Sequence, residues 1–170
     1  MSIILRRARP DDADFLFELI TDEETRPFLG LRAGESHADV TAEIERSSAE
    51  PDAFGWFVVE VDGERAGSVA FHRVNERNRI AEAGRFAIHP AFRGRGIGIE
   101  AARAFQRHLL GELGLHRVEL QIYGFNERAI AHAERCGYVR EGVKRKAYMK
   151  RGEWQDAVLF SLLQEDLPSE

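Results

Sequence analysis

The sequence predicts an α+β fold, with a mixed, mostly antiparallel sheet of about seven strands and about four flanking helices. Between residues 54 and 88, three runs rich in aromatic and β-branched residues follow one another, which indicates an antiparallel meander. Between residues 80 and 123, a strand, a glycine-rich turn, a helix and a second strand follow in order, which indicates a parallel pair. The 170 residues predict one domain, 1–170, that is large enough for a substantial core.

The N-terminal part predicts one strand and two helices. An apolar run at residues 3–5 is typical of a strand, and Pro10 with two aspartates after it is typical of a helix start. The helical pattern fails over residues 21–35, which form either a binding loop or a surface crossing. Ser36 then resembles a helix N-cap, with apolar residues at helical spacing after it.

The meander is predicted from its turns. Asp62 and Gly63 form the strongest short hairpin signal in the chain, and they join a strand at residues 54–61 to one at 66–74. A polar turn then leads into a third strand at residues 80–88. Consecutive strands joined by such short turns pair in antiparallel fashion.

A turn rich in glycine and arginine follows this third strand. Gly94, Gly96 and Gly98 fall within five residues, and apolar residues at spacing four then predict a helix. Backbone N–H groups in such a turn lie at the positive end of a helix dipole, which suits a phosphate or pyrophosphate. The glycines leave no Cβ atoms to hold an anion away, and Arg93 and Arg95 can add charge-assisted hydrogen bonds.

The turn taken alone is a weak signal, and a flexible strand–helix connection is the alternative interpretation. The chain has no Gly-x-x-x-x-Gly-Lys-Ser/Thr motif, and the glycine spacing lacks the two-residue gap of the dinucleotide-binding fingerprint. These two classes of phosphate site are therefore excluded.

The C-terminal part predicts a strand, a helix and a hairpin. Residues 118–123 alternate as a strand, which is expected to pair in parallel with the strand before the glycine-rich turn. Asn126 opens a helix, and Gly137 closes it. The last hairpin turns at Arg151-Gly152, and its return strand covers residues 154–163.

Composition restricts the class of protein. The net charge of −5 disfavours nucleic-acid binding, although a local basic patch is compatible with it. No apolar run approaches the roughly 20 residues of a membrane helix, and no signal-peptide pattern is present. The lone Cys136 rules out an internal disulfide, and a cytoplasmic protein is the simplest interpretation.

Several motifs together resemble the Gcn5-related N-acetyltransferases (GNAT) and, within them, the ribosomal-protein N-acetyltransferases of the RimJ/RimL-like branch. The resemblance covers nearly the whole chain, and any one motif alone would not be specific. The motifs are Arg93-x-x-Gly96-x-Gly98, Ala81-Glu82-Ala83-Gly84, Ile88-His89-Pro90, Leu115-His116-Arg117-Val118-Glu119-Leu120, Asn126, Gly137-Tyr138-Val139-Arg140-Glu141-Gly142 and Asp156-x-x-Leu159-x-Ser161-Leu162-Leu163.

The resemblance implies the GNAT fold, in which two central parallel strands splay apart and acetyl-coenzyme A lies in the gap. It implies no metal. By this analogy the turn holds the pyrophosphate, the end of the preceding strand pairs with the pantetheine arm, and an asparagine binds that arm from the other side. The implied coenzyme residues are Phe86, Ala87, Ile88, Arg93, Gly94, Arg95, Gly96, Ile97, Gly98 and Asn126.

The resemblance also suggests Glu82 as the general base that takes the amine proton, often through water. The alternative is that Glu82 anchors a substrate ammonium or pairs with an arginine such as Arg85. Both usual general acids are missing, because Ala129 and Ala133 stand where relatives carry serine or tyrosine. Tyr123, Tyr148 or water could protonate the leaving thiolate, and a thiol with a pKa of about 8.5 also leaves without an acid.

The acceptor is expected to be a primary amine: a protein N-terminus, a polyamine or a small amine metabolite or antibiotic. A lysine-like amine with a pKa of about 10.4 costs roughly 4 kcal/mol to deprotonate near neutral pH, whereas an α-amine costs below about 1 kcal/mol. A general base therefore matters most for a polyamine. The alternatives are a longer acyl donor and an inactive acyl-coenzyme A-binding or regulatory module. A homodimer through the late strands or helices is a further expectation from the family.

Five residues have ordinary structural interpretations, and for one of them, Asn126, a binding role is expected as well. His89 precedes a proline and is predicted to be a turn residue, and Cys136 is predicted to be a buried core thiol. Trp56 and Trp154 are predicted to be core or interface aromatics. Asn126 is expected to cap its helix and to bind the coenzyme arm as well.

Overall fold

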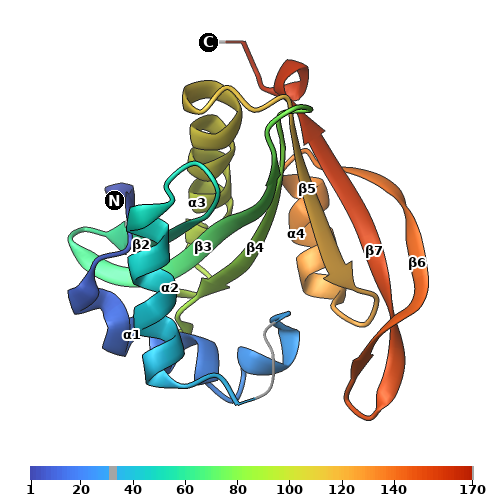
Figure 1. Ribbon diagram of the computed structural model, residues 1–170. Coiled ribbons are helices and arrows are strands. Elements are labelled where there is room, and N and C mark those ends of the chain that lie inside the picture. The colour runs from blue at the N-terminus through green and yellow to red at the C-terminus, as the bar shows by residue number, and fades with distance from the viewer. Residues whose placement is uncertain (31–33, 170) are drawn as a thin grey trace.

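The computed structural model describes residues 1–30 and 34–169, and its seven-stranded mixed sheet has the order β1-β2-β3-β4-β5-β7-β6 (Figure 1). The predicted α+β class and GNAT fold are confirmed. The strands are β1 (Ile3–Arg7), β2 (Gly55–Val61), β3 (Glu64–Asn75), β4 (Ile80–Ile88), β5 (Arg117–Tyr123), β6 (Val139–Lys150) and β7 (Glu153–Leu163). The α-helices of this described part are α1 (Ala13–Thr21), α2 (His37–Ala49), α3 (Ile97–Gln106) and α4 (Glu127–Arg135).

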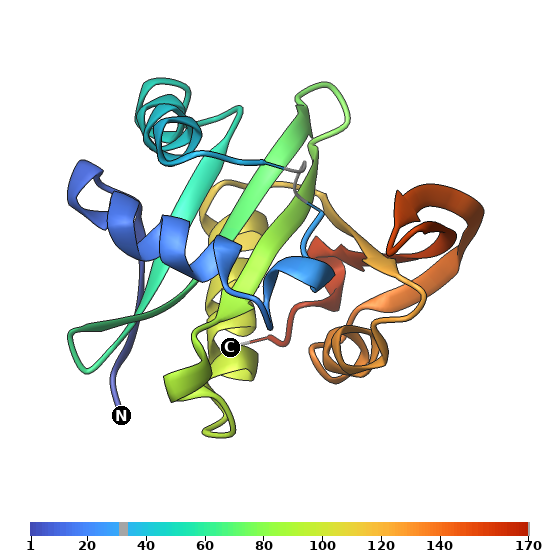
Figure 2. The same cartoon turned by 90° about the horizontal axis from the view of Figure 1, so that it is seen from below.

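The helices cover the two faces of the sheet separately (Figure 2). Helices α1 and α2 lie on one face, where Leu16, Ile44 and Trp56 belong to one buried cluster. Helices α3 and α4 lie on the other face, where Phe105 and Ala133 belong to a second cluster. The sheet is therefore buried on both faces near its centre, and the two cores fix the helices that border the site.

Local sequence signals are confirmed at several element ends. The Ser36 hydroxyl accepts a hydrogen bond from the Asp39 N–H, so the predicted N-cap of α2 is present. Asp62 and Gly63 have φ of 50° and 85°, the left-handed conformations that a tight hairpin requires. The helix start predicted at Pro10 is a short 3₁₀ turn, and α1 begins only at Ala13.

Strand β4 carries a β-bulge close to its end. Ser68 pairs with Ala87 and Ala70 pairs with Gly84, so β4 has one more residue than β3 in this stretch. Arg85 occupies the bulge with φ of 50°, and its carbonyl accepts a hydrogen bond from the Ser68 hydroxyl at 3.1 Å. A bulge bends its strand and redirects side chains, which is common beside active sites.

The predicted parallel pair, β4 and β5, is hydrogen-bonded only at its beginning. Its register runs from Ile80 opposite Arg117 to Glu82 opposite Glu119, and pairing stops there. Beyond that point β4 stays with β3, whereas β5 pairs with β7 along its whole length. The two strands separate toward the lower edge of Figure 1, so the sheet opens between them.

The end of α3 and the two tryptophans complete the description of the fold. Helix α3 continues directly as a π-helix over Arg107–Glu112. Trp56 is fully buried, but Trp154 is 61% exposed, so Trp154 is not a core residue. Among the described residues, none of the helices has the length and apolar character that a bilayer crossing requires.

Candidate active site

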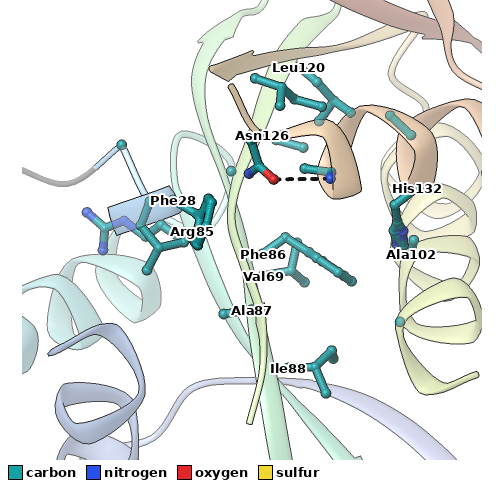
Figure 3. A pocket seen from close by; sticks show the side chains of 18 of the residues that line it. Phe28, Val69, Arg85, Phe86, Ala87, Ile88, Ala102, Leu120, Asn126 and His132 are labelled. Carbon is teal, nitrogen blue, oxygen red and sulfur yellow. Dashed lines mark hydrogen bonds between the residues drawn. The ribbon is translucent and has the colours of Figure 1, made fainter. Parts of the chain in front are cut away.

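A cleft of about 1250 Å³ lies where β4 and β5 separate. Its walls come from the end of β4, the glycine-rich turn, the start of α3, the end of β5, α4 and the segment between α1 and α2. Figure 3 shows Phe86 and Ile88 on the β4 side, with Asn126 and His132 across from them on α4. An open sheet binds ligands at this kind of site, beyond the carboxyl ends of parallel strands.

The glycine-rich turn is preorganised for an anion. Gly94 and Gly96 have φ of 76° and 74°, and Gly96 is the N-cap of α3. A Cβ atom added to either residue would meet no other atom within 4 Å, so the space in front of both is open. Gly98 differs, because it lies within α3 and its Cβ would contact His132 at 3.7 Å. Two of the three predicted glycines therefore shape the turn, and the third brings α3 close to α4.

The Arg93 side chain binds protein groups beside the turn. Its Nε donates to the Ile88 carbonyl at 3.0 Å, and its Nη2 donates to the Thr25 hydroxyl at 3.0 Å. Thr25 is 5% exposed, and its hydroxyl in turn donates to the Asp22 carboxylate at 2.9 Å. Arg93 also forms an ion pair with Glu24 at 3.3 Å. The Arg93 guanidinium therefore connects the turn to the segment after α1, a role that the sequence analysis did not predict.

The remaining predicted coenzyme residues lie in or beside the cleft. Phe86, Ala87 and Ile88 line it from β4. The Asn126 side chain accepts a hydrogen bond from the Ala129 N–H at 3.2 Å, so its predicted capping role is confirmed. Asn126 also lines the cleft, and its amide nitrogen points away from the hydrogen bond that caps α4 (Figure 3). Arg95 is exposed, and its guanidinium lies over the ring of the neighbouring Phe92.

Glu82 lines the cleft at the point where β4 and β5 part, and its side chain is 15% exposed. Its carboxylate lies 3.6 Å from the His72 imidazole and 3.4 Å from the Arg73 guanidinium. His72 lowers the pKa of Glu82, and the charges of Arg73 and Lys144 lower it further, whereas burial opposes them. Glu82 is therefore an anion at neutral pH.

Glu82 does pair with an arginine, as the alternative interpretation expected, but its partner is Arg73 and not Arg85. Arg85 points to the opposite side of β4 from Phe86, toward α2, and its guanidinium lies 3.5 Å from the Glu43 carboxylate (Figure 3). It also lies 4.7 Å from the centre of the Trp56 ring. Burial lowers the pKa of Arg85, because the charged form loses water contacts there. The positive φ at the bulge redirects Arg85, and no sequence pattern indicates a bulge at that residue.

Helix α4 brings an imidazole and a thiol together. The Cys136 Sγ lies 3.7 Å from the His132 ring nitrogens, and the His132 ring lies 5.1 Å from that of Phe86. Burial lowers the pKa of His132 and raises the pKa of Cys136, so both groups are neutral near pH 7. Cys136 is 7% exposed, as predicted for a core thiol. Its thiol is not activated as a nucleophile.

Two tyrosines line the cleft. The rings of Tyr123 and Tyr148 are 6.1 Å apart and nearly perpendicular, and the Tyr148 hydroxyl donates to the Gln121 amide oxygen at 2.7 Å. Burial raises the pKa of Tyr123, and Tyr148 raises it further. Tyr123 is therefore protonated at neutral pH and is able to donate a proton.

The described residues contain no group of three or more histidine, cysteine or acidic side chains that could hold a metal ion. The expectation of a metal-free site stays a prediction.

Comparison of the sequence with known protein families agrees with the fold and the cleft described above. Residues 2–139 match the family described as acetyltransferase (GNAT) domain. The chain therefore belongs to the GNAT acetyltransferase family and is an N-acetyltransferase family enzyme.

Individual relatives differ in the amines that their names specify. The chain is 31% identical to the putative ribosomal N-acetyltransferase YdaF of Bacillus subtilis, with 99% of this chain and 94% of that protein covered. It is 30% identical to the spermidine N(1)-acetyltransferase of Escherichia coli K12, with 67% of this chain and 61% of that protein covered. The structure of spermidine N-acetyltransferase from Vibrio cholerae with CoA and spermine has a TM-score of 0.88 at 24% identity, with 96% of each chain covered, so this likeness concerns the fold.

Proposed function

We propose that the chain, as one domain over residues 1–170, transfers an acetyl group directly from acetyl-coenzyme A to a primary amine. One observation carries the proposal: the strand pair opens into a cleft with unobstructed backbone amides at one end and an ionised carboxylate at the other. A direct transfer needs both substrates in one cleft, which orients them for attack.

The turn suits the diphosphate of the coenzyme. Gly94 and Gly96 are open on the side where an anion would lie, and α3 begins directly after them. Phe86, Ala87 and Ile88 offer their main chain to the pantetheine arm, and Asn126 offers its amide group from α4. Arg93 and Arg95 add positive charge near the turn. The Arg93 guanidinium is held by the Ile88 carbonyl, and the Arg95 guanidinium lies over the Phe92 ring.

Glu82 is our candidate for the acceptor of the amine proton. Its lowered pKa keeps it ionised at neutral pH, so it attracts an incoming ammonium and receives the amine proton only transiently during attack. A carboxylate of low pKa is a weak base, and this favours transfer through water to bulk solvent over storage of the proton on Glu82.

Two tyrosine hydroxyls line the cleft as candidate donors to the departing thiolate: that of Tyr123, whose pKa is raised by burial, and that of Tyr148. Ala129 and Ala133 offer no acidic group. A thiol with a pKa of about 8.5 leaves without assistance, so water is sufficient for this step.

For the acceptor we propose a primary amine of the kinds that the relatives' names specify, a ribosomal protein amine or a polyamine. The match to the putative ribosomal N-acetyltransferase spans nearly the whole chain, and this supports a place in the ribosomal-protein branch. The match to the bacterial spermidine enzyme covers a shorter stretch.

The proposal is tested by following release of coenzyme A thiol from acetyl-coenzyme A with a panel of polyamines, small amines and short peptides. We expect amine-dependent release with at least one class of acceptor and a mass increase of one acetyl group on the product. Saturable coenzyme binding with no turnover on any amine would contradict the proposal and identify an acyl-coenzyme A-binding module.

A further inference from the structure

Two consecutive residues of β3, His72 and Arg73, hold the Glu82 carboxylate from one side. Its Oε1 atom lies 3.6 Å from the His72 Nε2 atom, and its Oε2 atom accepts a hydrogen bond from the Arg73 Nη1 atom at 3.4 Å. All three residues line the cleft. Each carboxylate oxygen therefore has its own partner, and this restricts the rotation of the carboxylate within the cleft.

A bulge in β3 brings both side chains to the same carboxylate. His72 lies opposite Glu82 in the register, so these two side chains share one face of the sheet. Neighbouring residues of a regular strand point to opposite faces, but β3 has one extra residue between His72 and Asn75, and Arg73 has φ of 51°. A left-handed φ is unfavourable for arginine, and such conformations gather at functional sites.

Gly84 leaves room for the His72 ring. A Cβ atom added to Gly84 would lie 3.1 Å from the His72 Cε1 atom and 3.8 Å from its Nδ1 atom, and the first of these distances is shorter than an ordinary van der Waals contact. Gly84 is not among the glycines with a positive φ, so its backbone conformation is open to any residue. The close imidazole therefore accounts for a glycine at this position.

His72 is the principal partner of Glu82. It is the largest cause of the lowered pKa of Glu82, and the charges of Arg73 and Lys144 contribute less. The Arg73 side chain is 68% exposed, against 30% for that of His72, so solvent screens the arginine pair more strongly. Loss of the imidazole is therefore expected to free the carboxylate more than loss of the guanidinium.

We propose that His72 is a positioning residue for acetyl transfer, which holds the Glu82 carboxylate in the orientation that receives the amine proton. This inference rests on the proposed function and on the role of Glu82 in it. An N–H bond of the amine breaks as an O–H bond forms on Glu82 or on an intervening water, and the nitrogen lone pair attacks the thioester carbonyl carbon. His72 forms and breaks no covalent bond, but a carboxylate that turns away from the amine lowers the rate.

A cross-strand pair that only joins β3 to β4 is the alternative interpretation of His72 and Glu82. A pair of that kind contributes to the free energy of unfolding, and its loss lowers the rate only as far as the whole site is disturbed. A positioning residue lowers the rate through Glu82 alone. The two interpretations therefore differ in rate, in coenzyme affinity and in their dependence on Glu82.

The test is a double-mutant cycle in the full chain. We expect His72→Leu to lower kcat/KM for the amine by about tenfold and to leave coenzyme A affinity within about twofold. His72→Gln, whose amide N–H can donate to the same oxygen, should keep at least about half of the wild-type value. In the Glu82→Gln background, His72→Leu should cost less than about twofold. His116→Leu removes an exposed imidazole outside the cleft and should leave the rate unchanged.

A pH profile gives a second readout that a structural pair does not change. Without the imidazole the pKa of Glu82 rises, because the largest cause that lowers it is gone. The ratio of kcat/KM for His72→Leu to that of the wild type, in which ionisation of the amine cancels, should therefore fall as the pH is lowered and be constant at higher pH. Arg73, Lys144 of β6 and Glu119 of β5 are present in both proteins, so they do not produce this difference.

Gly84→Ala displaces the imidazole without removing a charge. Its Cβ atom requires the His72 ring to move, so we expect kcat/KM for the amine to fall by about threefold or more. The same substitution in the His72→Leu background should cost less than about twofold. Gly142→Ala is the matched control, because Gly142 also lies in a strand and a Cβ atom there would meet no other atom within 4 Å.

Four results would overturn the inference: a wild-type rate in His72→Leu, equal losses in His72→Leu and His72→Gln, an undiminished loss in the Glu82→Gln background, or a loss of coenzyme affinity that parallels the loss of rate. Should His72→Leu not fold, Gly84→Ala decides, and an unchanged rate in that variant overturns the inference. Failure of the proposed function looks different. In that case the wild type releases no thiol with any amine, whereas failure of this inference alone leaves wild-type turnover intact.

Discussion

The two ends of the cleft are built from different parts of the chain. The coenzyme end consists of main chain shaped by small residues, with Gly94 and Gly96 in left-handed conformations and open in front. The acceptor end consists of long side chains held by partners, such as Glu82 beside Arg73. We propose that the two ends therefore have different tasks: the coenzyme end binds the diphosphate, and the acceptor end determines the amine.

The largest effect is expected from crowding the coenzyme end. In Gly96→Val, a β-branched residue must adopt a φ near the present 74°, and its methyl groups enter the space in front of the turn. We expect calorimetry to show a loss of about 100-fold or more in coenzyme A affinity, which is the loss of two or more charge-assisted contacts.

Gly63→Val is the matched control, because Gly63 has φ of 85° and is equally open, but lies in the β2–β3 hairpin. It should lower stability and leave coenzyme affinity unchanged. Unaltered affinity in Gly96→Val, or equal losses in the two variants, would remove the distinction between the two ends.

The next effect belongs to the acceptor end. We expect Glu82→Gln to lower kcat/KM for the amine by about 100-fold, the usual contribution of a proton acceptor, without changing coenzyme affinity. Because the folded pKa of Glu82 is lowered, its charge is lost only as the pH falls through that lowered pKa. The wild-type rate above about pH 5 should therefore follow the pKa of the amine alone.

Glu119→Gln serves as the control for this substitution, since Glu119 is the β5 residue opposite Glu82 in the register and does not line the cleft. A Glu82→Gln variant that keeps the wild-type rate across the pH range would remove the assignment. A second ionisation near pH 7 that disappears in this variant would show that the pKa of Glu82 is raised instead.

The two ends are connected through Arg93 and Thr25. Thr25→Val keeps the shape of the side chain but removes the hydroxyl that accepts from Arg93 and donates to Asp22. We expect KM for the amine to rise by about five- to tenfold, corresponding to about 1 kcal/mol for a lost hydrogen bond, with less than a twofold change in coenzyme affinity. Steady-state kinetics and calorimetry give the two numbers.

Thr41→Val is the control for Thr25→Val, because Thr41 is a half-buried threonine of α2 whose hydroxyl donates to the His37 carbonyl and which does not line the cleft. A parallel loss of coenzyme affinity in Thr25→Val would mean that the segment after α1 supports the turn and not the acceptor wall.

The smallest effect is expected at Cys136. Removing the buried thiol in Cys136→Ala leaves a small cavity beside His132 and should lower the free energy of unfolding by about 1 kcal/mol. Turnover should stay within about twofold of the wild type, because the thiol is neutral and inert. A large loss of kcat with unchanged stability would assign chemistry to this residue.

Sequence reasoning succeeded where a single local pattern determines the conformation. The hairpin at Asp62-Gly63, the cap at Ser36 and the glycine-rich turn all follow from backbone preferences within a few residues. The parallel pairing of β4 with β5 followed from the helix between them.

It failed where partners come from distant segments. Glu43 is 42 positions from Arg85 in the sequence, and only the bulge in β4 turns Arg85 toward it. Arg93 was expected to serve the diphosphate, and no local pattern indicates that its side chain binds Thr25. Trp154 is exposed because the β6–β7 hairpin extends past the helices (Figure 1). This depends on how distant segments pack, which no local sequence pattern indicates.

A calorimetric cycle that crosses Gly96→Val with two ligands, coenzyme A and pantetheine, tests the central claim most directly. Pantetheine lacks the diphosphate, so it reports the strand-bound arm alone. If the turn binds the diphosphate through its amides, the substitution weakens coenzyme A by about 100-fold and leaves pantetheine within about twofold. Equal weakening of both ligands, or of neither, would contradict the account.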